Sequence, residues 1–327
     1  MLTPLPLAPP KLMLAALLTI VLPGIAAGAP AVVTDIGPVD SITARVMAGV
    51  GAPEPILPAG ADPHSYSLRP SEARRLGEAD LVVWIGPGMT PWLADPLDAL
   101  AGNARALRLD EVPGLTLLPV RSSGPFEPSS RDHGHDHGGD HGHDDDQGDG
   151  HDHSGTGIDQ HLWLDPANAA AFAEAVAAEL AELDPENAGT YRANAAAFRA
   201  EIGALEAEVS AILSPARGKP FIVFHDAYQY FEHRFEIPAA GSVALHDGEA
   251  PGAARVAEIR DRVIRDKVVC AFSEPQFPPK LLATITEGTD VRGADLDPEG
   301  VGLAAGPELY PTLIRTLATD LAACLDG

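Results

Sequence analysis

The chain alternates short, nearly continuous apolar runs with segments of helical periodicity, and it does so in two separate stretches. In the first stretch, "AVVTDI" and "DLVVWIG" are each followed by a helical pattern, and in the second "FIVF" and "VVCAFSEP" are followed in the same way. Strands that are buried on both faces of a parallel sheet have this composition. The alternation therefore predicts an α/β fold of two lobes, each with a parallel-rich sheet flanked by helices.

A long helical pattern separates the two stretches. It starts after Asp184 with Pro185 and runs to about Leu213, with apolar residues at helical spacing. At ~1.5 Å per residue such a helix is about 40 Å long, which is the size of a domain. We expect residues 185–214 to form a rigid linker helix between an N-terminal lobe, residues 30–184, and a C-terminal lobe, residues 215–327.

The first residues have the layout of a secretory signal peptide. Lys11 precedes the apolar run Leu12–Leu22, and small residues follow up to Ala29. The run is too short to span a bilayer as a stable helix. The alternative is a buried hydrophobic helix at the start of the fold. We expect residues 1–29 to be a signal peptide, and the mature chain, without another long uncharged segment, not to insert stably into membranes.

One segment carries chemistry but no core. From His133 to His153 it holds seven His, seven Asp, six Gly and one Gln, with nothing apolar to bury. Such a segment cannot offset the entropy of being ordered, so we expect a disordered loop over residues 121–158. Imidazoles among carboxylates on a glycine-rich backbone can bind divalent metals weakly. The imidazoles belong to His133, His135, His137, His141, His143, His151 and His153.

The overall charge limits the partners. A formal net charge of −25 disfavours nucleic acid and anionic lipid surfaces. It favours cations as ligands.

Cys270 and Cys324 are the two cysteines of the chain, and in an exported protein they are candidates for a disulfide. The alternative is two separate buried thiols.

Five of the twelve histidines lie outside the His-rich loop. His64 follows the apolar run "PILPAG", His161 opens "HLWLDP" after the loop, and His225 ends "FIVFH". Ligands of open α/β sheets bind at the carboxyl ends of strands, and these three positions suggest a shared metal site. A single histidine of this kind is more often a local hydrogen-bonding residue. His233 and His246 lack the strand-end context and are expected at surface or gating positions.

Four motifs in order give the chain a family resemblance. They are "GADPHSYSLRPSEARRLGEADLVVWIGPGM", "DQHLWLDP", "FIVFHDAYQYFEHRF" and "FSEPQFPPKLL", with an acidic His-rich insertion between the first two. From about Ala31 onward the chain resembles the zinc-specific solute-binding proteins of ABC uptake systems, the ZnuA family. The resemblance implies two lobes joined by a rigid helix and a monomeric periplasmic receptor, not an enzyme. It would capture Zn²⁺ as cargo between the lobes and deliver it to a membrane permease.

The resemblance also assigns residues. The metal histidines of the family fall on His64, His161 and His225. The pair Cys270 and Cys324 resembles the disulfide of some Gram-negative members.

The fourth ligand is where the chain departs from the family pattern. Some members have Glu immediately before the first histidine, whereas this chain has Pro63. The fourth position is then filled by water or by a carboxylate of the second lobe. Asp297 in "ADLDPEG" matches the position of an Asp ligand in related metal-binding proteins, and the lesser candidates are Asp295, Glu274 and Asp62.

Three imidazoles and one oxygen form a nitrogen-rich, four-coordinate site that suits zinc. Manganese prefers more oxygen ligands, although a manganese uptake receptor stays an alternative. A secreted zinc hydrolase is another, because three His and a water also describe a catalytic site, but the sequence has no HExxH motif. A third is a zinc buffer or surface-attachment protein. For a receptor, the His-rich loop is expected to be a weak zinc collector or sensor.

Overall fold

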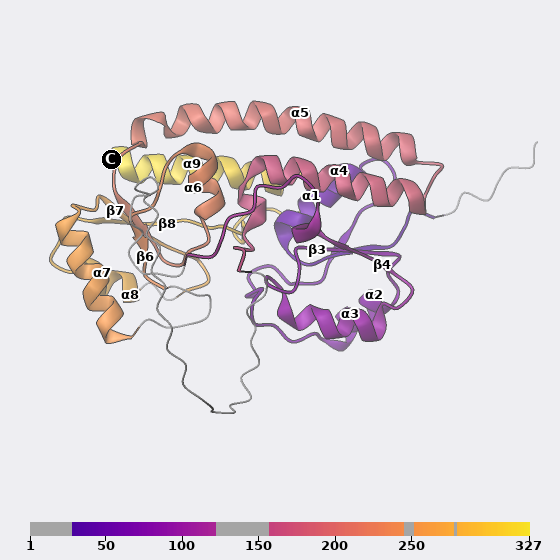
Figure 1. Ribbon diagram of the computed structural model, residues 1–327, viewed down its shortest axis with the longest axis horizontal. Helices are drawn as coiled ribbons and strands as arrows, with labels where there is room; N and C mark the ends of the chain where they lie inside the picture. The colour runs from indigo at the N-terminus through magenta and orange to yellow at the C-terminus, as the bar shows by residue number, and fades with distance from the viewer. Residues whose placement is uncertain (1–27, 122–156, 245–251, 278–279) are drawn as a thin grey trace, which may run out of the picture.

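The computed structural model describes residues 28–121, 157–244, 252–277 and 280–327. Most of the expected signal peptide, the histidines from His133 to His153, and His246 lie outside the described residues. Within the described part, two four-stranded sheets lie at opposite ends of the molecule, and long helices run along one side of both (Figure 1). The predicted two-lobed α/β fold is confirmed.

The first sheet has the strand order β2-β1-β3-β4, and its neighbouring strands pair in parallel. Leu81–Trp84 of the central strand β3 is fully buried, as the continuous apolar run predicts. The elements of this lobe are β1 (Val32–Thr34), α1 (Gly37–Met47), β2 (Glu54–Pro55), α2 (Pro70–Gly77), β3 (Leu81–Trp84), α3 (Ala94–Leu100), β4 (Arg105–Arg108) and α4 (Pro166–Leu183). Short 3-10 helices span Pro91–Leu93, Leu109–Glu111 and Leu162–Leu164.

The second sheet repeats this arrangement with the order β6-β5-β7-β8, again in parallel. Its elements are β5 (Phe221–Val223), α6 (Gln229–Phe235), β6 (Gly241–Ser242), α7 (Ala253–Arg265), β7 (Cys270–Ser273), α8 (Lys280–Thr286), β8 (Arg292–Asp295) and α9 (Leu309–Asp326). A 3-10 helix, Ser214–Ala216, leads into this lobe.

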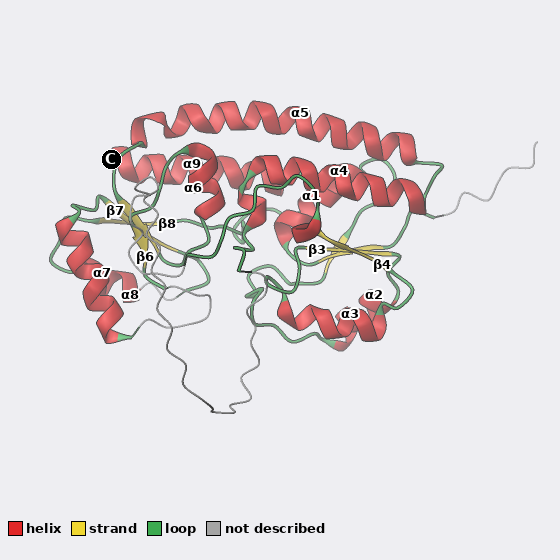
Figure 2. Ribbon diagram, in the orientation of Figure 1, coloured by secondary structure: helices red, strands yellow, loops and turns green. Residues whose placement is uncertain are grey.

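Each sheet packs between two layers of helices (Figure 2). The outer face of the first sheet packs on α2 and α3 through residues such as Val82 and Leu97, and the outer face of the second packs on α7 and α8 through Ile222 and Ile259. The inner faces of both sheets belong to one continuous apolar cluster that includes α1, α4, α5 and α9. The two lobes therefore share their main core.

The long linker helix α5 covers Ala188–Leu213. The helix begins at Ala188 rather than at Pro185, because the Asp184 carboxylate is hydrogen-bonded before the helix starts. This carboxylate accepts hydrogen bonds from Asn187 Nδ2 at 2.7 Å and from Tyr191 Oη at 2.8 Å. One face of α5 is apolar and packs on α4, α1 and α9, so the helix extends along both lobes (Figure 1).

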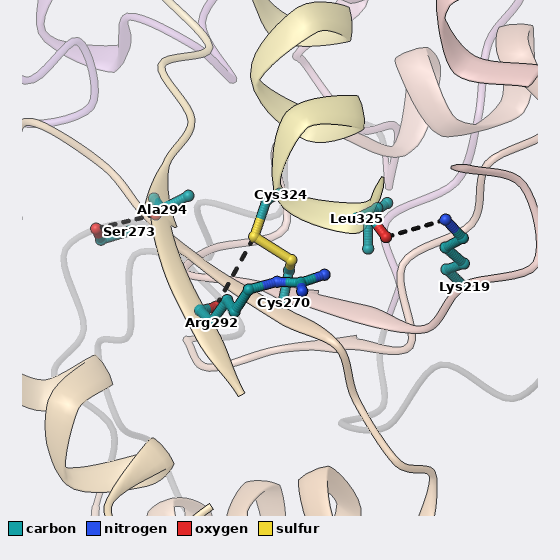
Figure 3. Close-up of a disulfide and its surroundings, with 7 residues drawn as sticks. All are labelled: Lys219, Cys270, Ser273, Arg292, Ala294, Cys324 and Leu325. Atoms are coloured by element: carbon teal, nitrogen blue, oxygen red, sulfur yellow. Dashed lines mark hydrogen bonds between the residues drawn. A yellow bond between two sulfur atoms is a disulfide. The ribbon is translucent and has the colours of Figure 1, made fainter. Parts of the chain in front are cut away.

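A disulfide joins Cys270 at the start of β7 to Cys324 in the last turns of α9, with the two Cα atoms 6.2 Å apart (Figure 3). Both cysteines are buried. Nearby, Lys219 Nζ donates to the carbonyl oxygen of Leu325 at 3.1 Å. The disulfide predicted from the sequence is thus confirmed, and it fastens α9 to the second sheet.

A carboxylate is buried where β1 ends. Asp35 is fully buried, and its two carboxylate oxygens accept hydrogen bonds from the backbone N–H of Ile36 and of Ile85, each at 2.8 Å. Burial raises the pKa of Asp35 to about 7, although the two N–H donors lower it. The Asp35 side chain therefore links the ends of β1 and β3. Its contribution to the free energy of unfolding depends on pH, because the buried carboxyl group resists ionisation.

We expect Asp35→Asn to change the pH dependence of stability. Because the folded pKa of Asp35 lies above its unfolded value, its contribution is complete below about pH 4 and is lost as the pH rises to about 7. The unfolding free energy of the wild type minus that of the variant should fall by up to about 1.4 kcal/mol per pH unit across that window. Urea unfolding at several pH values measures this difference, and a flat difference would contradict the assignment.

Candidate metal centre

His64, His161 and His225 come together between the two sheets. The ring centroids of His161 and His225 are 5.3 Å apart, and those of His64 and His161 are 5.9 Å apart. With Zn–N bonds of ~2.0–2.1 Å, two imidazoles on one tetrahedral zinc have their ring centres about 5 Å apart. The spacing therefore suits a common ion. Across the described ranges, however, no group of three or more His, Cys, Asp or Glu side chains is already arranged to hold a metal.

The secondary-structure positions of the three histidines differ from the expectation. His225 does follow strand β5 closely. His64 lies in the long loop between β2 and α2, and His161 immediately precedes the 3-10 helix Leu162–Leu164. The strand-end rule therefore holds for one histidine of the three, and the other two reach the same place on loops.

Carboxylates orient two of the rings. His161 Nδ1 lies 2.8 Å from Asp159 Oδ1, and His225 Nδ1 lies 2.6 Å from Glu274 Oε1. A proton on Nδ1 that is shared with a carboxylate leaves the lone pair on Nε2, the usual arrangement for a metal-binding histidine. Both histidines are 7 % exposed, which fixes the rings further. Asp159 was not singled out from the sequence, and Glu274 supports His225 in this structure.

Asp62 and Asp295 have other partners. The Asp62 carboxylate accepts from the backbone N–H of His64 at 2.9 Å and from Ser65 Oγ at 2.7 Å, so it shapes the loop that carries His64. Asp295 is exposed at the end of β8 and accepts a hydrogen bond from Ser273 Oγ. His233 is exposed on α6, in agreement with a surface position.

Asp297, the expected fourth ligand, caps a turn of its own loop. Its Oδ1 accepts from the backbone N–H of Glu299 at 3.1 Å and of Gly300 at 2.9 Å, and its Oδ2 accepts from Gly302 at 3.3 Å. Gly300 has a φ of +74°, a conformation that favours glycine, so the turn needs both residues. An Asp that bonds to the backbone a few residues onward is typical of turns, and "DPEG" carries that signal.

The same turn places Glu299 near the histidines. Burial raises the pKa of Glu299 to about 8, the Asp297 carboxylate raises it as well, and His225 and His161 lower it. The carboxyl group is thus close enough to both rings to interact with their charge. The sequence pattern did not indicate Glu299, which stands two positions after the expected ligand.

Two sheets on a shared helical layer, with histidines from both halves between them, define a two-lobed solute-binding protein. A solved structure described as "Crystal structure of ZnuA" has this fold, with a TM-score of 0.73, 25% identity, and coverage of 90% of this chain and 99% of that one. The chain belongs to the ZnuA family, whose model, "Zinc-uptake complex component A periplasmic", matches residues 32–324. The resemblance inferred from the four motifs is confirmed.

Two relatives illustrate the membership. The "High-affinity zinc uptake system protein ZnuA" of Brucella abortus (strain 2308) is 45% identical over 311 residues, which cover 90% of this chain and 91% of the relative. The protein of the same description from Paracoccus denitrificans (strain Pd 1222) is 44% identical over 338 residues, which cover 97% of this chain and 98% of the relative.

In the part of the chain that the structure describes, no helix is long and apolar enough to cross a membrane.

The different roles of Asp297 and Glu299 can be separated without metal. We expect Asp297→Ala to lower the unfolding free energy by about 1–2 kcal/mol, because three backbone N–H groups lose their acceptor. Glu299→Gln should leave the unfolding free energy at pH ~7 unchanged or raise it. Burial opposes ionisation of the Glu299 carboxyl group in the folded protein, and Gln has no group to ionise. Urea unfolding in a chelator measures both, and equal losses would contradict this division of roles.

Proposed function

We propose that the chain is a periplasmic receptor that binds Zn²⁺ between its two lobes and delivers it to the permease of an ABC importer. The observation that carries the proposal is the meeting of His64, His161 and His225 between the sheets, two of them oriented by buried carboxylates. Membership of the ZnuA family supports zinc as the cargo. We further propose that residues 1–29 are removed on export and that the mature receptor is a monomer and not an enzyme.

The proposed ligand set is His64, His161 and His225 with one oxygen donor. The turn around Asp297 favours Glu299 or water as that donor, since the Asp297 oxygens already accept backbone hydrogen bonds. Three imidazoles and a single oxygen suit zinc better than manganese, which prefers more oxygen ligands. A cation at this point would also favour the ionised form of Glu299, because opposite charge lowers the pKa of a carboxyl group.

One observation favours a second candidate, a zinc-dependent hydrolase. Three histidines with a water also describe a catalytic zinc site, and the Glu299 carboxyl group is close enough to His225 and His161 to be influenced by their charge. Hydrolysis of generic ester and peptide substrates by the zinc-loaded protein, lost in Glu299→Gln, would support the hydrolase. Tight zinc binding without such hydrolysis supports the receptor.

The histidine assignment is tested by single substitutions. We expect His64→Ala, His161→Ala and His225→Ala each to weaken tight zinc binding at least ~10-fold, because an incomplete ligand shell remains. His233→Ala is the matched control, because its side chain is an exposed imidazole on α6, and it should bind zinc normally. Competition titration with a chelator measures the affinities. Unchanged tight binding in any of the three variants would overturn the assignment of that residue.

We also propose that the histidines from His133 to His153 form a weak, multi-ion zinc collector. Each bound arrangement would have to order a glycine-rich chain, so its affinity should lie well below that of a pocket between two packed lobes. Tethering keeps captured ions at high local concentration near the centre.

Deleting residues 131–153 separates the collector from the tight site. The shortened protein should keep one tight zinc per chain and lose the additional weak ions, as metal stoichiometry at low and high zinc would report. Loss of the tight zinc on deletion would mean that the loop supplies ligands to the centre.

A further inference from the structure

Two segments that are distant in sequence form a short strap beside the metal centre. Residues 118–121 and 157–159 pair as an antiparallel bridge between Pro119 and Ile158. Val120 N–H donates to the carbonyl of Gly157, and Asp159 N–H donates to the carbonyl of Leu118, both at 2.9 Å. We call these two segments the strap. The chain reaches it from β4 of the first lobe by crossing toward α6 of the second (Figure 1).

Tyr230 of helix α6 binds both sides of the strap. Its hydroxyl group accepts from the backbone N–H of Leu118 at 3.0 Å and donates to the carbonyl of Asp159 at 2.9 Å. The ring is fully buried, so the hydroxyl is held in place by packing as well. Asp159 is the residue whose carboxylate contacts both the backbone N–H and Nδ1 of His161, at 3.0 and 2.8 Å. Tyr230 therefore fixes the backbone of the group that orients His161.

Arg121 fastens the strap to the second lobe at a different point. Its Nε donates to Asp226 Oδ2 at 2.9 Å, and its Nη1 donates to Glu232 Oε2 at 2.9 Å. The two carboxylate side chains are only 10 % and 5 % exposed, so the guanidinium offsets two nearly buried charges. Asp226 is bonded directly to His225 in the chain, and Glu232 also accepts from the backbone N–H of Ala239 at 3.1 Å. The anchor is thus itself fixed within the second lobe.

We propose that Arg121 and Tyr230 are positioning residues for metal capture, which act by holding the strap across the lobes and so setting the separation of His161 and His225. Tyr230 acts on His161 through Asp159. Arg121 acts on the opposite ligand, because it pairs with the residue that follows His225. The inference rests on the proposed function, since it assigns a role only if these histidines bind the cargo. It makes the spacing of the two rings a property of the strap as well as of the shared core.

The test uses the full mature chain with Tyr230→Phe and Arg121→Lys. Tyr230→Phe removes both hydroxyl hydrogen bonds and keeps the buried ring, and Arg121→Lys keeps a positive charge but cannot donate to both carboxylates in the same fork geometry. Substituting groups behind metal ligands typically costs 10–100-fold in affinity, so each variant should bind zinc about 10-fold more weakly. The visible absorption of the Co²⁺-loaded protein should also change, because it reports the geometry around the metal.

Arg45→Ala is the matched control. Arg45 on α1 also forms ion pairs across elements, with Glu201 of α5 and with Glu308 at 2.8 Å just before α9, and neither partner belongs to the strap or to the histidine contacts described above. The Arg45→Ala variant should have a lower unfolding free energy than the wild type but the same zinc affinity and the same Co²⁺ spectrum. An equal loss of zinc affinity in Arg45→Ala would overturn the proposal, because the effect would then be one of general stability.

His161→Ala distinguishes a failure of the strap proposal from a failure of the proposed metal site. If His161→Ala weakens zinc binding but Tyr230→Phe and Arg121→Lys bind zinc and Co²⁺ as the wild type does, the strap proposal is wrong and the metal site stands. If His161→Ala itself binds zinc normally, the proposed site fails and the strap loses its role with it.

Discussion

Burial of the inner faces of both sheets against one layer of helices is the constraint on which the rest of the structure depends. Phe221 of the second sheet and Leu81 of the first belong to a single apolar cluster, which is continued through Phe198 of α5 and Tyr310 of α9. Because the helices are common to both lobes, neither sheet can move far without exposing apolar surface, at ~25 cal/mol per Å². The proposed ligands His64, His161 and His225 are therefore held in one region, with the ring centroids of neighbouring pairs 5.9 and 5.3 Å apart.

The candidate metal centre is built by residues that stand behind the proposed metal ligands. Asp159 and Glu274 set the orientation of two imidazoles. The turn with Glu299 is held from both halves: Trp163 Nε1 donates to the carbonyl of Pro298 at 2.9 Å, and Tyr228 Oη donates to that of Leu296 at 2.8 Å. Side chains that are already oriented lose less conformational entropy on binding, which favours tight capture of a small ion.

The sequence predicted the buried parts of the fold better than its edges. Strands β3 and β5 are continuous apolar runs, and β7 is apolar up to its last residue, Ser273. The sequence pattern indicates all three because both of their faces are covered. The sequence pattern did not indicate β4, with two exposed residues in "RALR", or the two-residue β6, because short edge strands have no apolar period. Their pairing is fixed by the neighbouring strand rather than by their own residues.

The same distinction applies to the centre. The three histidines of the proposed site could be picked out from motifs, because each stands in a distinctive local context. The roles of Asp297 and Glu299 could not, because they depend on a turn that is held in part by Trp163, 135 residues away in sequence from Pro298. A local cue existed in "DPEG", where an Asp before Pro and Gly favours a turn closed by its own carboxylate. The strap likewise joins segments on either side of residues 122–156, and no local pattern could indicate it.

The shared core also affects how the molecule comes apart. Two domains with separate cores can unfold one after the other, whereas lobes that bury their sheets on the same helices lose that cluster together. An ion bound between His161 and His225 is then linked to the whole unfolding reaction rather than to one lobe, and it stabilises the molecule by mass action. The melting temperature of the entire chain thereby becomes a measure of how much of the centre is filled.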